Sequence, residues 1–404
     1  MARNDGTGNE CTRNKGTEKM GTDELVVVDL PPGPEWVGLV TRLWLDEVPF
    51  LPLDHRLTER ERRAIVDRAR PHFVRGTGGE TLLADAAPVT PGVAIVMPTS
   101  GTAGKPKLVE LHRVAVVVAV SRSAKRLGAS PEAPWVCPLT PAHIGGLLVL
   151  LRAAILGAPV TMHESFDPER LVRDGEGAAF ASVVPGMVRR LVASDLPLDG
   201  LTLLVGGDAI DPDTAGAARA RGARLVTTYG LTETCGGFTY DGVPLDGMQV
   251  RLDADGAIEV SGSTVMEDYR LDPAATGAAF TTDGWLRTGD LGALDDDGRL
   301  EVLGRADHVI RTGAEKVWPE EVERVLAGHP KVADVAVVGR PDPEWGARVS
   351  AFVVPSVIDD PPSLEELRAH GAEHLARFKL PKELSFVTEI PRTGTGKVRR
   401  NALR

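Results

Sequence analysis

The sequence predicts an α/β fold: a large N-terminal region of α/β layers with a small β subdomain, followed by a small α+β C-terminal domain. Short apolar runs alternate with amphipathic helical segments over roughly the first 250 residues, which is typical of α/β layers. Short strands joined by Asp-Gly turns come next and indicate the β subdomain. The last hundred or so residues then mix helices and strands.

The first elements follow from hydrophobic periodicity. A strand is predicted over 26–30, and helices are predicted over 36–45 and over the charged segment 58–71. The apolar run 93–96 is predicted as a strand, and the long apolar run 145–159 as a helix.

Farther along, apolar runs within 183–194, 201–210 and 224–230 each end in a glycine-containing turn. Ligands bind at the carboxyl ends of strands in such sheets, so these turns are candidate site positions. The Asp-Gly turns in 253–262 and 295–304 predict hairpins of the β subdomain.

The C-terminal part reads as one compact unit. Its predicted elements are a helix over 319–330, strands over 332–341 and 349–355, a helix over 363–375 and a basic loop over 391–400. At the other end, residues 1–22 are polar and are predicted to be disordered.

Length, net charge, cysteine spacing and the length of apolar runs exclude several classes of protein. With 404 residues and 42% hydrophobic side chains, the chain can form ordinary cores. The net charge of -11 and scattered basic residues argue against a nucleic-acid groove, so we expect small-molecule partners. Cys11, Cys137 and Cys235 form no CxxC pair, which argues against zinc and disulfides and fits a cytoplasmic protein. No run reaches the ~18 apolar residues of a membrane span.

Residues 97–109, MPTSGTAGKPKLV, follow the apolar run 93–96 and predict a phosphate-binding loop. Glycines let backbone N–H groups converge on an anion, while hydroxyls and lysines add donors and charge. The spacing departs from GxxxxGK[ST], so a different phosphate-binding family is expected. A flexible surface loop is the alternative interpretation of this segment taken alone.

Four further segments occur in a fixed order: TTYGLTETCGG from Thr227, WLRTGDLG from Trp285, VLGRADHVIRTGAEKVWPEEVE from Val302 and PRTGTGKVRR from Pro391. With the phosphate loop, they resemble the core motifs of the adenylate-forming superfamily of acyl-CoA synthetases, peptide-synthetase adenylation domains and luciferases. The resemblance covers about three quarters of the chain. It implies an N-terminal domain over 23–303 that binds ATP and an acid, and a mobile C-terminal domain over 304–404.

The resemblance also assigns roles. The segment from Thr99 to Lys107 would hold the ATP phosphates, Tyr229 would cover the adenine, Thr232 would contact the α-phosphate, and Glu233 would bind Mg²⁺. The residues expected to contact ATP are Thr99, Ser100, Gly101, Thr102, Gly104, Lys105, Lys107, Gly206, Gly207, Asp208, Tyr229, Asp290 and Arg305. Ala103 and Leu108 depart from the usual loop.

In the later motifs, Asp290 would accept both ribose hydroxyls, because a carboxylate can accept two hydrogen bonds at once. Arg305 would contact the ribose or a phosphate, and Asp307 corresponds to the hinge position of the mobile C-terminal domain. Lys397 resembles the catalytic lysine, which bridges the attacking carboxylate and the α-phosphate. Each has a plain structural alternative, such as a turn cap or a solvated tail lysine.

The acid pocket is expected around His143 and Gly230, with His143 as a gate beside the carboxylate or, alternatively, a histidine bonded to backbone. Arg152 interrupts an apolar helix and must find an anion or water. It forms an internal ion pair, extends its charge to the surface, or meets a second carboxylate of the substrate. The segments 141–160 and 229–247 resemble those of o-succinylbenzoate-CoA ligases, which points to an aromatic dicarboxylic acid.

The acceptor is the open part of this prediction. Coenzyme A is expected by resemblance, but Gly313 is followed by Ala314, Glu315 and Lys316, whereas thioester-forming relatives usually have paired glycines there. A carrier-protein thiol, an amine, or nitrite with an aryl amine are the alternatives. A non-catalytic family member is a third interpretation, which the presence of Lys397, Glu233 and Asp290 disfavours. A homodimer is compatible with the sequence.

Overall fold

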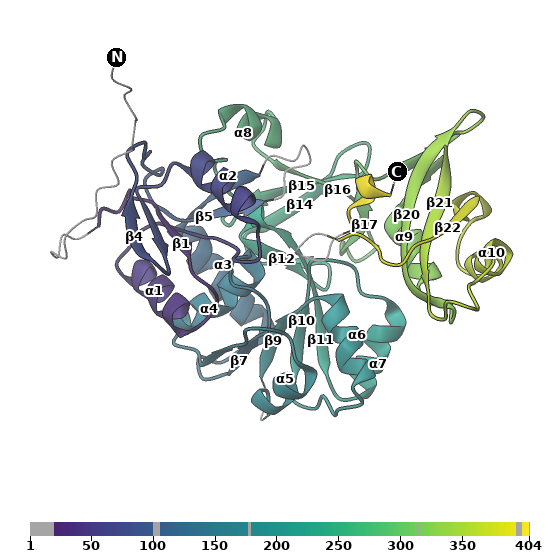
Figure 1. Cartoon of the computed structure of the whole chain (residues 1–404), viewed down its shortest axis with the longest axis horizontal. Helices are drawn as coiled ribbons and strands as arrows, with labels where there is room; N and C mark the ends of the chain where they lie inside the picture. Colours follow the sequence, from purple (N-terminus) through teal and green to yellow (C-terminus); the bar gives the residue numbers. More distant parts are fainter. Residues whose placement is uncertain (1–19, 100–105, 177–178, 314, 393–397, 404) are drawn as a thin grey trace, which may run out of the picture. The chain divides into compact units, whose positions relative to one another are not determined.

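The computed structural model describes residues 20–99, 106–176, 179–313, 315–392 and 398–403 (Figure 1). By its internal contacts the chain divides into two compact units. The first is Met1–Gln249 with Ser261–Leu286, and the second is Val250–Val260 with Arg287–Arg404. The predicted boundary between residues 303 and 304 remains a prediction, and of the segment predicted to be disordered only residues 20–22 are among the described residues.

The first sheet has the strand order β4-β3-β1-β2-β5-β6. Its strands are β1 (Val26–Asp29), β2 (Phe50–Pro52), β3 (Phe73–Gly76), β4 (Gly79–Leu82), β5 (Val93–Thr99) and β6 (Lys107–His112). The helices that follow β1 and β2 are α1 (Pro34–Leu45) and α2 (Glu59–Ala69). Thr58 starts α2 through a capping box with Glu61, which satisfies two backbone donors at the helix start.

The second sheet has the order β13-β12-β11-β10-β9-β7-β8. Its strands are β7 (Trp135–Cys137), β8 (Val160–Met162), β9 (Phe180–Val183), β10 (Thr202–Val205), β11 (Arg224–Leu231), β12 (Gly236–Tyr240) and β13 (Val243–Pro244). Strands β7 to β11 pair in parallel. The associated helices are α4 (Ile144–Leu156), α5 (Pro168–Asp174), α6 (Pro185–Ala193) and α7 (Pro212–Ala220).

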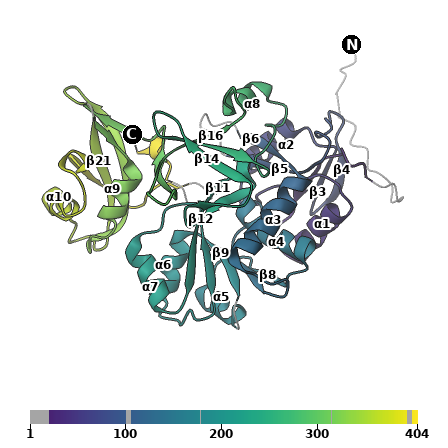
Figure 2. The ribbon, with the colours of Figure 1, turned by 180° about the vertical axis from the view of Figure 1, so that it is seen from behind.

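Helix α3 (Arg113–Leu127) packs against α4 between the two sheets (Figures 1 and 2). It contacts β5 and β6 of the first sheet and β12 of the second, while α4 contacts β7, β8, β9 and β12. The other face of the second sheet is covered by α6 and α7, whose Val188, Leu191 and Ala218 are fully buried. This layering confirms the predicted α/β architecture of the N-terminal region.

A third sheet contains the predicted Asp-Gly hairpins, in the order β14-β15-β16-β17. Its strands are β14 (Met248–Leu252), β15 (Ala257–Gly262), β16 (Leu286–Leu294) and β17 (Leu300–Arg305), and helix α8 (Pro273–Ala279) lies in the connection between β15 and β16. The turns use Gly256 and Gly298, both at positive φ, a conformation that glycine adopts without steric cost.

The fourth sheet has the order β19-β18-β21-β20, with β22 paired to β21. Its elements are β18 (Ile310–Thr312), β19 (Glu315–Val317), α9 (Pro319–Leu326), β20 (Val332–Asp342), β21 (Gly346–Pro355), α10 (Leu364–Ala372), the 3₁₀ turn η2 (Arg377–Lys379), β22 (Glu383–Phe386) and the 3₁₀ turn η3 (Arg400–Ala402). Val322 and Leu326 of α9 and Leu367 of α10 pack on one face of β20 and β21. Ile390 and Leu403 cover the other.

Candidate active site

The parallel strands of the second sheet bring several predicted residues to one edge. Gly206, Gly207 and Asp208 follow β10, while Tyr229 lies near the end of β11 and Glu233 just after it, so both segments lie at the carboxyl edge of the sheet. A Cβ atom on Gly206 would lie 2.5 Å from Thr228 Oγ1, so the threonine side chain of the neighbouring strand leaves little room for one there. Asp208 is exposed, with its carboxylate accepting a hydrogen bond from the backbone N–H of Ala209.

The turn after β11 is held by its own side chains. Thr232 to Thr234 form the 3₁₀ turn η1, and Thr234 Oγ1 donates to the Gly236 carbonyl oxygen at 2.8 Å and accepts from the Leu231 N–H at 2.8 Å. Gly236 then packs against α4, since a Cβ atom on it would lie 2.8 Å from Leu148 Cδ1. The motif that carries Thr232 and Glu233 is therefore fixed against the helix that begins after His143.

Tyr229 and Gly230 end β11 beside β12. The Tyr229 ring packs edge-on against Phe238, with ring centroids 5.2 Å apart. A Cβ atom on Gly230 would lie 2.0 Å from the Gly236 carbonyl oxygen, so this position tolerates only glycine. The two strands thus approach closely where the adenine and the acid are predicted to bind.

Glu233 is suited to hold a hard cation. Its Oε1 accepts a hydrogen bond from the Tyr269 hydroxyl at 2.8 Å, while its Oε2 has no partner among the described residues. Mg²⁺ prefers oxygen ligands and is often bound by one or two carboxylates together with phosphate oxygens and water. One oriented carboxylate with a free oxygen fits that ion, and no preformed cluster of three or more metal-binding side chains occurs within the described ranges.

The phosphate loop connects two paired strands. Thr99 ends β5 and lies opposite Lys107, which begins β6. The Lys107 ammonium lies 4.5 Å from the centroid of the Tyr269 ring. The predicted phosphate ligands Ser100, Gly101, Thr102, Gly104 and Lys105 lie outside the described residues.

His143 is the residue before α4, and its imidazole meets a pair of side chains that the sequence did not single out. His143 Nε2 lies 3.3 Å from Asp54 Oδ2 and 3.3 Å from Arg56 Nη2. Arg56 donates to both oxygens of Asp54, at 2.6 Å from Nη2 to Oδ2 and 2.9 Å from Nε to Oδ1. Burial opposes the Asp54 charge, but the bonds from Arg56 and His143 outweigh it and hold the carboxyl pKa well below its usual range.

Arg152 is only 4% exposed. Its Nη1 donates to the Leu148 carbonyl oxygen and its Nη2 to Ser123 Oγ, both at 2.8 Å, and the guanidinium lies 4.0 Å from the Trp135 ring centroid. Within the described part of the chain, it pairs with no carboxylate and its buried Nε has no partner. Burial lowers the pKa of the guanidinium. An internal ion pair and a surface-reaching side chain were two of the predicted alternatives, and this geometry supports neither.

In the second unit, Asp290 and Arg305 are opposite residues of β16 and β17. Arg305 Nη1 donates to Asp290 Oδ1 at 3.3 Å and Nε to Asp307 Oδ1 at 3.2 Å. Burial opposes the charge of Arg305, but the two aspartates outweigh it and raise the guanidinium pKa. Asp290 is 7% exposed, and the hinge role of Asp307 stays a prediction. Lys397 lies outside the described residues.

Cys137 and Cys235 are buried and free, and burial raises the pKa of each thiol to about 12. Neither is a nucleophile at neutral pH, because the thiolate is the reactive form.

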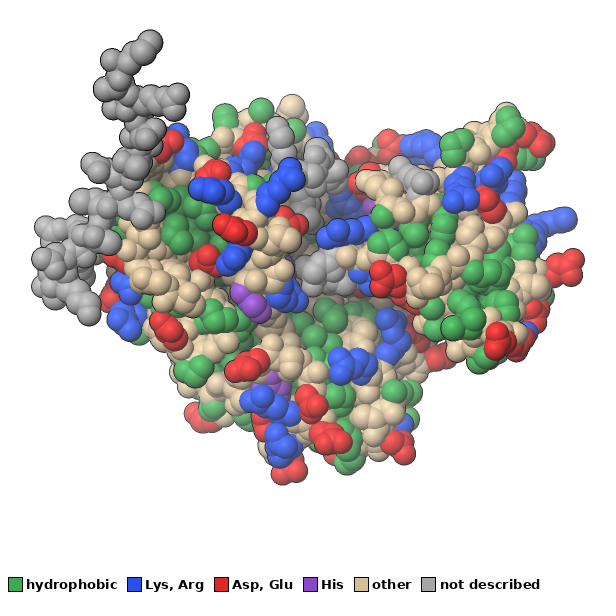
Figure 3. All heavy atoms as spheres, viewed as in Figure 1, with side chains coloured by type: hydrophobic (Ala, Val, Ile, Leu, Met, Phe, Trp, Pro, Cys, Tyr) green, Lys and Arg blue, Asp and Glu red, His purple; other side chains and the backbone are tan. Residues whose placement is uncertain are grey.

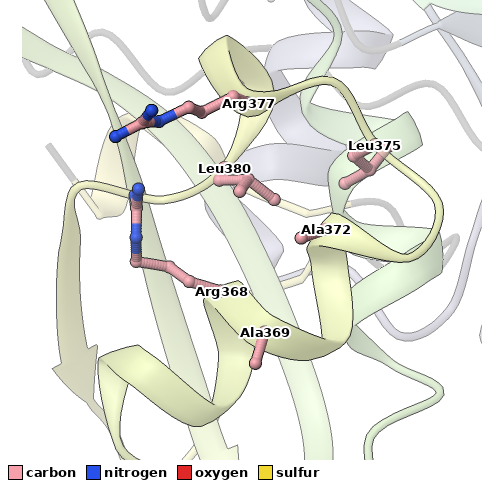
Figure 4. Close-up of a pocket in the computed structure, with 6 residues that line it drawn as sticks. All are labelled: Arg368, Ala369, Ala372, Leu375, Arg377 and Leu380. Atoms are coloured by element: carbon pink, nitrogen blue, oxygen red, sulfur yellow. The ribbon is translucent and has the colours of Figure 1, made fainter.

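A surface pocket of the second unit is lined by Arg368, Ala369, Ala372, Leu375, Arg377 and Leu380 (Figure 4). None of the predicted site residues lines this pocket.

On the face shown in Figure 3, basic and acidic side chains are interspersed. None of the described helices has the length and apolar character needed to cross a bilayer.

Sequence reasoning missed Asp54, Arg56 and Tyr269. Asp54 and Arg56 follow the strand-like run 48–53. Polar residues at the carboxyl end of a strand are candidate ligand-binding residues, so this pair could have been predicted. Tyr269 has no such signal, because its partner Glu233 is 36 positions away.

Comparisons with known proteins agree with this geometry. Residues 17–269 match the AMP-binding enzyme family, and residues 321–397 match the AMP-binding enzyme C-terminal domain. A probable 2-succinylbenzoate–CoA ligase of Mycobacterium tuberculosis (strain CDC 1551 / Oshkosh) is 41% identical over 324 residues, covering 77% of this chain and 84% of that protein.

Two solved structures are also similar. The o-succinylbenzoate CoA synthetase of Bacillus subtilis in complex with the acyl-adenylate intermediate OSB-AMP has a TM-score of 0.85 and 28% identity, covering 94% of this chain and 88% of that one. The same synthetase with ATP and magnesium ion has a TM-score of 0.84 and 27% identity, covering 94% and 89%. The chain belongs to the AMP-binding enzyme family, the adenylate-forming superfamily that its five motifs resemble.

Proposed function

We propose that the chain is an AMP-forming acid–thiol ligase that adenylates 2-succinylbenzoate and transfers the acyl group to coenzyme A. A relative 41% identical to this chain carries that name as a probable function, and a structurally similar synthetase was solved in complex with the acyl-adenylate OSB-AMP. The observation within this chain that carries the choice of a dicarboxylic acid is Arg152. It is a buried cation whose partners among the described residues are a carbonyl oxygen, a hydroxyl and an indole ring, and a second substrate carboxylate would supply a counter-ion.

In the first half-reaction, the acid's carboxylate oxygen attacks the α-phosphorus of ATP and pyrophosphate leaves. The loop from Thr99 to Lys107 would hold the β- and γ-phosphates, and Tyr229 would cover the adenine. Asp290 would accept the ribose hydroxyls, with Arg305 beside it. Bound Mg²⁺ would offset phosphate charge, and Glu233 would hold it.

Two further residues would act on the reacting groups. Thr232 would donate to the α-phosphate, and Lys397 would lie between the attacking carboxylate and the α-phosphate, reducing the repulsion between two anions. His143, held by Asp54 and Arg56, would lie beside the acid's reacting carboxylate, with Gly230 leaving space for the acyl chain. In the second half-reaction, the thiolate of coenzyme A attacks the acyl carbon and AMP leaves.

ATP–pyrophosphate exchange tests the first half-reaction, with 2-succinylbenzoate and matched monocarboxylic acids as substrates. Mass spectrometry of the products, with and without coenzyme A, tests the second. Exchange that depends on 2-succinylbenzoate, and a thioester that needs coenzyme A, are expected. Exchange only with monocarboxylic acids would contradict the proposed substrate.

Lys397→Ala separates the two half-reactions. Adenylation should fall by roughly two to three powers of ten, as when a donor to a transition-state charge is lost. Thioester formation from supplied acyl-adenylate should be largely spared. Equal losses in both steps would refute the role of Lys397.

The second candidate keeps adenylation and changes the acceptor to a carrier-protein thiol, an amine, or nitrite with an aryl amine. The observation that favours it is the β18–β19 hairpin, where Gly313 at positive φ precedes the exposed charge of Glu315. The assay without coenzyme A, repeated with each acceptor, distinguishes the two candidates. A cytoplasmic location and a homodimer also remain proposals, and light scattering tests the latter.

A further inference from the structure

Tyr269 joins two parts of the candidate active site that are far apart in the sequence. Its hydroxyl donates to Glu233 Oε1 at 2.8 Å, and the Lys107 ammonium lies 4.5 Å from its ring centroid. The residue is 6% exposed, so the hydrogen bond and the ring face are largely shielded from water. One side chain therefore contacts both the predicted Mg²⁺ ligand and a lysine of the predicted phosphate loop.

The backbone fixes this arrangement. Tyr269 forms an antiparallel bridge with Val109 of β6, the strand that Lys107 begins. On either side of that bridge, the Glu110 N–H donates to the Asp268 carbonyl oxygen at 3.1 Å, and the Arg270 N–H donates to the Leu108 carbonyl oxygen at 2.7 Å.

Glu233 is held at a second point. Its carbonyl oxygen accepts a hydrogen bond from the Met266 N–H at 2.8 Å, three residues before Tyr269. The segment 266–269 thus contacts both the main chain and the carboxylate of Glu233. The phenol occupies Oε1, and Oε2 stays without a partner among the described residues.

We propose that Tyr269 is a positioning residue of the Mg²⁺–ATP site, which rests on the proposed function of Glu233 and Lys107. The hydroxyl fixes the rotation of the Glu233 carboxylate so that Oε2 faces the ion. Metal-binding carboxylates are generally held in this way by outer hydrogen bonds, and loss of such a partner typically costs 10- to 100-fold in metal affinity. The ring face holds the Lys107 ammonium by a cation–π contact.

The variants Tyr269→Phe and Tyr269→Leu separate the role of the hydroxyl, which holds Glu233, from the role of the ring, which contacts Lys107. The phenylalanine keeps the ring and removes only the hydroxyl, so it should weaken Mn²⁺ binding to the enzyme–ATP complex about 10- to 100-fold. Binding of metal-free ATP, measured in excess chelator, should be unchanged. The leucine also removes the ring, so metal-free ATP should bind more weakly as well. Water-proton relaxation of bound Mn²⁺ and equilibrium dialysis of ATP measure both without turnover.

Tyr240→Phe is the matched control, because it deletes another buried phenol hydroxyl, one that donates to Ser123 Oγ. Its Mn²⁺ affinity should equal that of the wild type. Wild-type Mn²⁺ affinity in Tyr269→Phe would overturn the proposal. So would an equal loss of Mn²⁺ and metal-free ATP binding in a variant with a lowered melting temperature, because that pattern indicates a merely structural role. Failure of the wild type to adenylate 2-succinylbenzoate would remove the proposed substrate, whereas these binding measurements would still report on Tyr269.

Discussion

Two arginines of the first unit are equally buried and differ in their partners. Arg270 is 2% exposed and its Nη1 donates to Glu110 Oε1 at 2.8 Å, so the charge is paired with a carboxylate that is itself 3% exposed. It also donates to three main-chain carbonyl oxygens, those of Ala69, Ala87 and Pro88.

Arg152 is 4% exposed, but its partners are the Leu148 carbonyl oxygen, the Ser123 hydroxyl and the Trp135 ring, all of them neutral. Taking a guanidinium out of water is costly unless it is paired and hydrogen-bonded. Because the charge of Arg270 is paired with a carboxylate, we interpret Arg270 as a structural residue. Because the described partners of Arg152 are all neutral, we interpret Arg152 as a residue whose counter-ion is a bound ligand.

The largest effect is expected at the paired arginine. Arg270→Met leaves Glu110 buried without its partner, and breaking a buried pair typically costs about 3–5 kcal/mol. Urea unfolding should show this loss, while KM for 2-succinylbenzoate in the folded protein stays unchanged. The double variant Arg270→Met/Glu110→Leu, which removes both charges, should recover most of the stability. Wild-type stability of the single variant would show that burial and pairing do not make Arg270 structural.

Arg152→Met should show the opposite pattern. The methionine keeps much of the stem volume and removes a charge that has no counter-ion among the described residues, so stability should stay near that of the wild type. KM for 2-succinylbenzoate should rise roughly ten- to hundredfold, because a charged hydrogen bond to a ligand contributes about 1.5–3 kcal/mol.

The control for Arg152→Met is a monocarboxylic analogue of the acid, whose KM should change little. Equal losses on both acids would make Arg152 a structural residue. A fall in stability as large as that of Arg270→Met would remove the distinction between the two arginines.

Local signals in the sequence predicted most of the fold. The 36–45 and 58–71 helices form as α1 and α2, and Thr58 and Glu61 supply the capping box that starts α2. The 145–159 helix forms as α4, because thirteen residues of nearly continuous apolar character can be buried between two sheets.

The site was less predictable, because its decisive contacts join distant segments. The sequence marked Arg152 as a charge in an apolar helix, but its neutral partners Ser123 and Trp135 lie on other elements and follow no local pattern. The same holds for Tyr269 and Glu233. Asp54 was within reach of sequence reasoning, because it closely follows the strand β2.

The smallest effect is expected at a third arginine, Arg56, which has a carboxylate partner but a half-exposed side chain. Asp54→Asn removes that partner's charge, and solvent screening limits the loss of stability to about 1 kcal/mol at pH 7. Because the folded-state pKa of Asp54 is depressed, its contribution is fully present above the unfolded pKa of about 3.9 and is lost as pH falls toward the folded value.

The wild type should therefore be more stable than Asp54→Asn by a constant amount above about pH 5, and by less below about pH 4. Urea unfolding between about pH 3 and pH 7 measures the difference. KM for the acid should rise by only a few-fold, because His143 keeps its contact with Arg56. A stability difference that does not change with pH would show that pairing does not lower the pKa of the Asp54 carboxyl group. A KM increase as large as that of Arg152→Met would assign the second carboxylate to the neighbourhood of Arg56 instead.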